Sequence, residues 1–183
     1  MCRIEMKTIT ARDYRYMKNE CNYIGRNDHC IKGYLGATNA LLPTDRNKMA
    51  NSIYEQMRAA QTYHNQENSR IGLHLIFEFA PSECQHLDRK KVLGIGYDIA
   101  EKEFPNCITY FSVHDNKEHL HLHMMLSTVM LHNGRMYGSG KKGWRCIGYD
   151  VHGLLNQFVP EEDIGDLQIY DLDKDEIVYG RKN

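Results

Sequence analysis

The chain has no long hydrophobic run and little proline. No apolar stretch approaches the roughly 20 residues that a membrane-spanning helix needs, and the opening residues, MCRIEMKTIT, lack the hydrophobic core of a signal peptide. These absences predict a cytoplasmic protein that has no membrane partner. With 183 residues, of which 42% are hydrophobic and 4 are proline, the chain is long enough to fold as one compact domain with a sizeable core.

Cysteine pairs with metal-binding or redox spacing are also missing. The chain has 6 cysteines, and no two of them form a C-x-x-C motif or a zinc-finger spacing. Dispersed cysteines of this kind favour reduced thiols over a disulfide framework. We therefore expect no structural zinc site built on cysteine.

The net charge is small, at −1, but it is unevenly distributed. After Pro160 the chain has eight acidic and three basic residues. Of the 23 basic and 24 acidic residues of the whole chain, residues 1–160 therefore hold 20 and 16, which gives this part a charge of +4. We predict a functional domain over residues 1–160 and an acidic C-terminal tail over residues 161–183, in which LQIYDL and EIVYG can pair as a hairpin.

The hydrophobic pattern alternates between helices and strands, without repeats or low-complexity tracts. We predict helices at residues 10–23, 44–63, 82–104 and 149–159. We predict strands at residues 72–80 and 107–113, a further strand through the histidines that follow, and a hairpin turn at residues 132–134. This succession is typical of an α+β domain with a central, largely antiparallel sheet of about five strands flanked by helices.

The segment HDNKEHLHLHMML, residues 114–126, holds four histidines. Because a strand turns successive side chains to opposite faces, His119, His121 and His123 are predicted to share one face, with leucines on the other. His114 lies just upstream, where the preceding strand ends. Imidazoles at this density repel one another when protonated, so a metal site explains the pattern better than a polar face open to water.

The stretch GRMYGSGKKGWR, residues 134–145, has four basic residues and no acidic residue, with two aromatic rings between them. Basic side chains interleaved with rings suit single-stranded nucleic acid, because the rings stack on bases and the cations contact phosphates. A solvated glycine-rich loop is the alternative interpretation. The candidate DNA-binding residues are Arg135, Lys141, Lys142, Trp144 and Arg145.

The order of these parts resembles the conjugative relaxases, the MobA/VirD2-like mobilisation nucleases of the HUH endonuclease superfamily. Those proteins have a helix that ends in a Tyr-Ile pair, here NYI at residues 22–24, and then a Lys-Gly connection, here IKGYLGATN. They continue to a pattern of the form H-x-D-x-x-H-x-H-x-H, whose histidine spacing is reproduced by VHDNKEHLHLHMML. The similarity spans about residues 14–155.

The resemblance implies a role for each matching residue. His121 and His123 match the paired histidines of the superfamily, His114 matches the third metal ligand, and Tyr23 matches the nucleophile. His119 is then a second candidate ligand or a partner of the ligands, because three same-face residues on one strand span too far to reach one ion easily. The implied cofactor is a divalent ion, Mn²⁺ or Mg²⁺, with Zn²⁺ or Ni²⁺ as substitutes in crystals.

Three positions depart from the family pattern, and one of them is Ser127, where family members often have asparagine shortly after the last histidine. The aspartate expected two residues after the first histidine stands one position earlier, as Asp115, and it is our candidate for orienting a histidine or helping to remove a proton. The serine usual in the strand that corresponds to FEF is replaced by Glu78. Glu78 is either an acidic group near the metal or a residue on the solvent face of its strand.

The activity that the resemblance implies is metal-dependent nicking of one DNA strand at a transfer origin, for mobilisation of a plasmid or integrative element. The tyrosine hydroxyl attacks phosphorus and forms a covalent 5′-phosphotyrosine, which preserves the bond energy for rejoining. A phenol, whose free pKa is about 10, needs a base or a metal to take its proton. The implied partners are single-stranded origin-of-transfer DNA and accessory relaxosome proteins.

Three other functions fit parts of the sequence. The string HLHLHMM also fits a histidine-triad nucleotide hydrolase or transferase, in which a histidine attacks a nucleotide phosphate without metal. That interpretation leaves His114 and the N-terminal tyrosine region unexplained. A rolling-circle replication initiator would use the same metal and tyrosine on other DNA, and a metal-binding module without catalysis is the third alternative.

Overall fold

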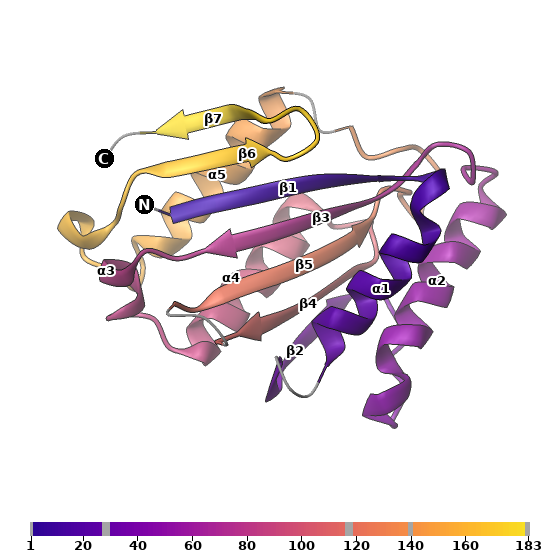
Figure 1. Ribbon diagram of the computed structural model, residues 1–183, viewed down its shortest axis with the longest axis horizontal. Helices are drawn as coiled ribbons and strands as arrows, with labels where there is room; N and C mark the ends of the chain where they lie inside the picture. The colour runs from indigo at the N-terminus through magenta and orange to yellow at the C-terminus, as the bar shows by residue number, and fades with distance from the viewer. Residues whose placement is uncertain (1, 27–29, 116–118, 139–140, 182–183) are drawn as a thin grey trace.

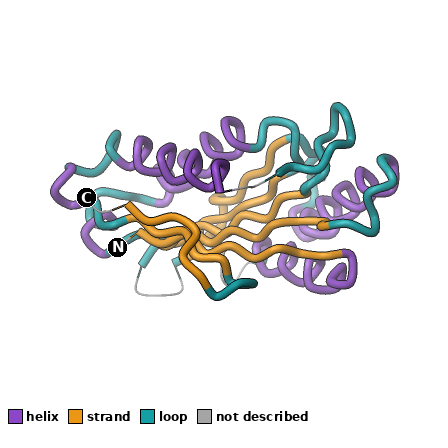
Figure 2. Tube along the Cα trace, turned by 90° about the horizontal axis from the view of Figure 1, so that it is seen from above, coloured by secondary structure: helices purple, strands orange, loops and turns teal. Residues whose placement is uncertain are grey.

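The computed structural model describes residues 2–26, 30–115, 119–138 and 141–181, and this part of the chain forms a sheet with helices on both faces (Figures 1 and 2). Short 3-10 helices lie at Ala11–Asp13, Arg46–Lys48 and Glu161–Asp163. The other elements are β1 (Cys2–Thr10), α1 (Tyr14–Gly25), β2 (Cys30–Thr38), α2 (Met49–Tyr63), β3 (Arg70–Glu78), α3 (Pro81–Cys84), α4 (Arg89–Glu103), β4 (Thr109–His114), β5 (His121–Ser127), α5 (Lys141–Leu155), β6 (Leu167–Asp171) and β7 (Glu176–Arg181).

The seven strands pair in the order β2-β4-β5-β3-β1-β6-β7. All neighbours run antiparallel except β1 and β6, which are parallel. The predicted α+β class and its largely antiparallel sheet are confirmed. The strand count is higher than the predicted five, because β1 and β2 were not foreseen.

In the first strand, β1, buried residues alternate with partly exposed residues, and this pattern explains its place inside the sheet. Cys2, Ile4 and Met6 are buried on one face, and the residues between them are partly exposed on the other. Such alternation is typical of a strand with one buried face.

Helices cover the two faces of the sheet to different extents. On one face α4 and α5 pack over a large apolar cluster that includes Ile95, Ile147 and Phe77. On the other face α1 and α2 pack over a smaller cluster that includes Met17 and Ile53. Figure 1 shows that α1 and α2 lie over one end of the sheet and leave β6, β7 and most of β1 uncovered on that face.

Several predicted elements differ from the observed ones. The predicted helix over residues 82–104 is broken into α3 and α4, because the side chain of Asp88 accepts a hydrogen bond from the Lys91 N–H and starts a new helix. The last helix, α5, begins at Lys141 and therefore includes part of the predicted glycine-rich loop. The turn near residues 132–134 is confirmed: Val129 bridges to Met136, and Gly134 has a φ of 68°.

The acidic tail belongs to the same sheet as the rest of the chain. Its predicted hairpin is present as β6 and β7, and β6 pairs with β1 from Cys2↔Leu167 to Met6↔Asp171. None of the helices in the described ranges is long and apolar enough to cross a membrane.

Candidate functional site

Two neighbouring strands bring the histidines together. His114 is the last residue of β4, and it pairs directly with His121, the first residue of β5. His123 follows two positions later, so its side chain lies on the same face as that of His121. The face is the one that α1 covers in part.

These three histidines form a candidate metal site. One nitrogen from each ring lies within 4.8 Å of the others, and His114, His121 and His123 are 0%, 2% and 6% exposed. The ring centroids are separated by 4.6 to 5.4 Å. Three neutral imidazoles are a donor set that suits divalent transition-metal ions, so the residues fit the implied metal.

His119 takes a different position from the one that the alternating pattern predicted. It precedes β5, and within the described ranges the metal-binding cluster is formed by the other three histidines. Its backbone carbonyl oxygen lies 3.2 Å from Nδ1 of His121. Because a carbonyl only accepts, Nδ1 of His121 carries the proton and Nε2 keeps its lone pair for a ligand.

The structure also brings Tyr23 to the histidines. The ring of Tyr23, near the end of α1, lies 5.1 Å from the ring of His114 and 5.2 Å from that of His123. Two contacts hold this end of the helix against β4. The hydroxyl of Ser112 donates to the carbonyl of Ile24 over 2.7 Å, and Gly25 lies so close that a Cβ there would be 2.5 Å from the Tyr110 oxygen.

A further histidine, His74 on β3, was not predicted from the sequence. It is 4% exposed, and its Nε2 lies 3.2 Å from Nδ1 of His123. Burial lowers the pKa of His74 to about 4, with further lowering by the charges of Lys7 and His114, so the ring is neutral at physiological pH. The string GLHLIFEFA contains only one histidine, so its sequence pattern does not distinguish a histidine near a metal site from a histidine in the hydrophobic core.

Two residues of α1 contact the outer nitrogen of His74. Its Nδ1 lies 3.3 Å from the hydroxyl oxygen of Tyr16 and 3.5 Å from a carboxylate oxygen of Glu20. Burial raises the pKa of Glu20, while Lys7 and a hydrogen bond from Tyr16 oppose the rise. Burial and the nearby Glu20 raise the pKa of Tyr16.

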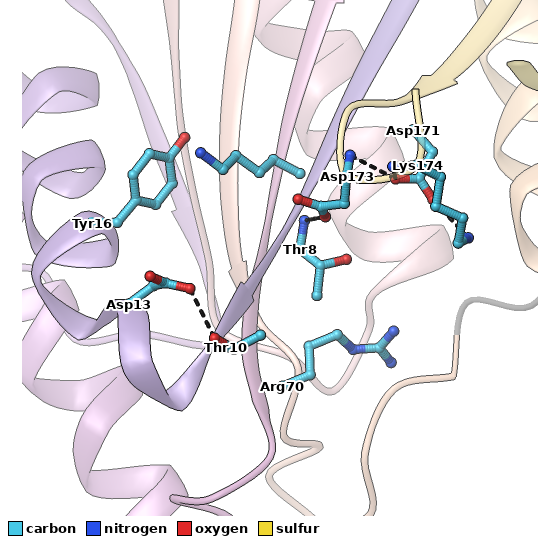
Figure 3. Close-up of a pocket in the computed structure, with 9 residues that line it drawn as sticks. Thr8, Thr10, Asp13, Tyr16, Arg70, Asp171, Asp173 and Lys174 are labelled. Carbon is cyan, nitrogen blue, oxygen red and sulfur yellow. Dashed lines mark hydrogen bonds and ion pairs between the residues drawn. The ribbon is translucent and has the colours of Figure 1, made fainter. Parts of the chain in front are cut away.

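Tyr16 lines a cavity on the same side of the sheet (Figure 3). The cavity has a volume of about 530 Å³ and lies between the start of α1 and the turn that joins β6 to β7. The ammonium group of Lys7 lies 3.9 Å from the centre of the Tyr16 ring. In the turn, Asp173 accepts a hydrogen bond from the N–H of Thr8 over 2.6 Å.

Glu78 lies next to the histidines. It ends β3 and pairs directly with His121 across the strands, so both side chains start from the same face of the sheet. Its side chain is partly exposed. The position therefore combines both predicted alternatives, since it faces the site and also reaches solvent.

Asp115 is directed away from this site. Its carboxylate accepts a hydrogen bond from Arg89, which begins α4 on the opposite face of the sheet. The alternation of side chains along the chain explains the difference, because Asp115 directly follows His114. The structure does not bring Asp115 to the histidines.

In the described part of the predicted DNA-binding stretch, Trp144 and Arg145 lie on α5, which covers the face of the sheet opposite to the histidines. Trp144 is 4% exposed and packs in the apolar cluster under α5, so its ring is not available to stack on a base. This burial removes Trp144 from the predicted DNA-contact set. Arg135 and Arg145 are exposed, while the side chains of Lys141 and Lys142 lie outside the described residues.

Comparisons with known proteins place these features in a family. A family model for the nuclease domain of MobA/VirD2-like relaxases matches residues 34–147, which is more than half of the chain and includes His74 and the three clustered histidines. Tyr23 precedes the matched range. A solved structure from a study of the molecular basis of vancomycin resistance transfer in Staphylococcus aureus is similar in fold, with a TM-score of 0.56 and 15% identity over 86% of this chain and 91% of that one. No curated protein matches the chain.

Proposed function

This chain belongs to the MobA/VirD2-like family of relaxase nucleases, DNA nickases that act in mobilisation, and on that premise we propose that Tyr23 and three histidines carry out its cleavage. The proposed reaction is transesterification at a transfer origin, with one strand cut. The observation that supports it is the position of the Tyr23 ring, 5.1 and 5.2 Å from the rings of His114 and His123. A tyrosine beside a buried imidazole cluster places a nucleophile next to a site for a cation.

We propose that His114, His121 and His123 hold one divalent ion, with Mn²⁺ preferred to Mg²⁺ because imidazole nitrogen is a poor ligand for magnesium. When bound, the ion supplies positive charge that stabilises the phosphate oxygens during an in-line displacement. The carbonyl of His119 keeps His121 in the tautomer whose Nε2 can bind the ion.

The proposed chemical step exchanges one phosphoester for another. The hydroxyl oxygen of Tyr23 forms a bond to phosphorus, and the bond from phosphorus to the 3′ oxygen of the preceding nucleotide breaks. The phenol proton is lost, the leaving 3′ oxygen takes up a proton, and the products are a 5′-phosphotyrosine and a free 3′-hydroxyl. No oxidation or hydrolysis is required, so the step is reversible and permits rejoining.

The DNA strand is proposed to approach over the part of the sheet that α1 and α2 leave uncovered (Figure 1). On this face the guanidinium group of Arg3 lies 4.7 Å from the centre of the Tyr170 ring. Arg135, Lys141, Lys142 and Arg145 are proposed to contact the DNA backbone away from the cleavage site. Accessory relaxosome proteins would complete the assembly at the origin.

The histidine-triad alternative does not account for the family or for the tyrosine beside the histidines. A replication initiator would use the same residues, and it differs in the DNA sequence that is cut. Origin-specific oligonucleotides therefore separate these two nicking functions.

The test uses labelled single-stranded oligonucleotides from the origin of transfer, incubated with the protein and Mn²⁺. On a denaturing gel, the wild-type protein should shift the label by the mass of the protein, and EDTA should abolish the shift. The Tyr23→Phe variant should bind the oligonucleotide and form no adduct, whereas Tyr63→Phe, which changes a tyrosine that is 82% exposed, should behave as the wild type. An adduct of wild-type yield with Tyr23→Phe would move the nucleophile to another residue.

A further inference from the structure

We propose that His74, held by Glu20, is a positioning residue that fixes His123 in the tautomer able to bind metal. The proposal deepens the metal site and rests on the proposed function. It assigns a role to three buried or half-buried side chains, His74, Glu20 and Tyr16, that the cleavage step itself does not use.

The contact between the two imidazoles allows two opposite arrangements of protons. Nε2 of His74 and Nδ1 of His123 lie 3.2 Å apart, so one of these nitrogens donates and the other accepts. If Nδ1 of His123 donates, its Nε2 keeps the lone pair that a metal needs. If Nδ1 accepts, Nε2 carries the proton and the ring cannot bind a metal ion. The tautomer of His74 therefore decides whether His123 is a ligand.

The contacts on the other side of His74 favour the first arrangement. An ionised carboxylate only accepts hydrogen bonds, and an oxygen of Glu20 lies 3.5 Å from Nδ1 of His74. The negative charge of an ionised carboxylate at this distance favours the tautomer that carries its proton on Nδ1, so that Nε2 of His74 accepts from His123. His74 is 4% exposed, so water does not compete for either nitrogen.

Tyr16 is the residue that can reverse the chain of hydrogen bonds. Its hydroxyl oxygen lies 3.3 Å from Nδ1 of His74, and a hydroxyl can either donate or accept. Tyr16 directs its O–H toward the carboxylate of Glu20 and keeps its proton. The oxygen of Tyr16 is then left as an acceptor for His74. Glu20 thus sets the direction of the whole series, from His123 through His74 to the carboxylate.

The first test measures the affinity for Mn²⁺ by calorimetry in the absence of DNA. His74→Phe keeps the ring but has no acceptor, and we expect it to lower the affinity about 10- to 100-fold, as loss of a ligand's hydrogen-bond partner usually does. His74→Gln restores an acceptor at the position of Nε2 and should recover most of the affinity. A folded His74→Phe protein with wild-type affinity would overturn the proposal.

The α1 residues provide a matched pair of variants. Glu20→Leu removes the acceptor and releases the Tyr16 hydroxyl to donate to His74, so it should lower the affinity for Mn²⁺ about tenfold or more. Tyr16→Phe removes one acceptor of His74 and leaves the carboxylate of Glu20 in place, so its loss of affinity should be smaller than that of Glu20→Leu. Equal losses in the two variants would contradict the role assigned to Glu20.

A spectroscopic readout does not depend on metal or on any variant. In ¹⁵N-labelled, metal-free protein at neutral pH, long-range ¹H–¹⁵N spectra should show His123 protonated at Nδ1 and His74 protonated at Nδ1. The opposite tautomer of either ring would overturn the proposal. Failure of wild-type protein to bind Mn²⁺ would instead overturn the metal site of the proposed function, and the tautomers would still decide the arrangement of His74.

Discussion

A hydrogen bond to a backbone carbonyl orients the imidazole of His121. Its Nδ1 donates to the carbonyl of His119, so the side chain of His119 is not needed for this contact. We therefore expect His121→Ala to lower the affinity for Mn²⁺ more than tenfold, because one of three ligand atoms is lost. His119→Ala is the matched control, two residues away, and should change the affinity less than threefold.

Calorimetric titration with Mn²⁺ measures both variants under the same conditions. Equal losses in the two proteins would mean that the side chain of His119 is a ligand, as the alternating sequence pattern allowed. Unchanged affinity in His121→Ala would contradict the assignment of His121.

Sequence spacing predicted part of the site and missed the rest for physical reasons. His114, His121 and His123 are brought together because they lie on neighbouring strands at the same face, and this periodicity is visible in the sequence. His74 lies next to His123 because β3 pairs with β5. The local sequence pattern does not predict which strands pair. Asp115 was expected beside the histidines, but it directly follows His114 and is directed to the other face.

At the scale of elements, the contact between α4 and α5 contains two acidic side chains. Glu103 and Asp150 share a hydrogen bond, and burial together with the charge of Asp150 raises the pKa of Glu103 to about 7. Folding therefore favours the protonated form of Glu103. The stability that this proton provides is present below the ordinary pKa of about 4.5, and it is lost as the pH rises through about 7.

We accordingly predict that Glu103→Gln stabilises the protein at pH 8 and has little effect near pH 5. Because Glu103 is partly exposed, the gain should be modest, on the order of 2–4 °C in the melting temperature. Glu101→Gln, on an exposed position of the same helix, removes the same charge without the contact to Asp150. Thermal melts followed by circular dichroism at both pH values provide the comparison, and equal shifts in the two variants would contradict the coupling.

The elements that the sequence predicted well are those with local signals. The strand through residues 72–80 and the acidic hairpin both have clear apolar patterns between turns, and they correspond to β3 and to β6 with β7. The break between α3 and α4 depends on a single capping contact at Asp88, which a continuous helical pattern hides. The strand β2 contains glycines at positions 33 and 36, which predicted an irregular connection.

At the scale of the whole molecule, the division into residues 1–160 and 161–183 leads to a direct test. Ile164, Leu167 and Ile169 are buried in the same apolar cluster as β1 and α5. Their burial contributes roughly 5–9 kcal/mol in total, which is comparable with the whole stability of a typical domain. We therefore expect a protein truncated after Pro160 to be unfolded or insoluble.

Circular dichroism and the melting temperature of the truncated protein measure this prediction. A matched control is a protein truncated after Asp173, which keeps β6 and removes all of β7, and it should retain more structure. A cooperative transition at the wild-type temperature in the shorter protein would establish residues 1–160 as an independent domain.

The pairing of β1 with β6 illustrates what the sequence alone could not provide. The partners Cys2 and Leu167 are far apart in the chain, and their parallel contact depends on how the whole sheet is assembled. The overall α+β class followed from local patterns, but the strand order is a property of the folded molecule.

The measurement that tests the central claim most directly is the mass of the peptide that carries the DNA after cleavage. Trypsin separates the tyrosines of α1 into different peptides, because Tyr14 lies in residues 13–15, Tyr16 in residues 16–18 and Tyr23 in residues 19–26. After an Mn²⁺-dependent reaction and trimming of the oligonucleotide by a nuclease, the mass of a nucleotide 5′-phosphate should be found on residues 19–26. The same mass on another tyrosine peptide would contradict the assignment of Tyr23 as the nucleophile.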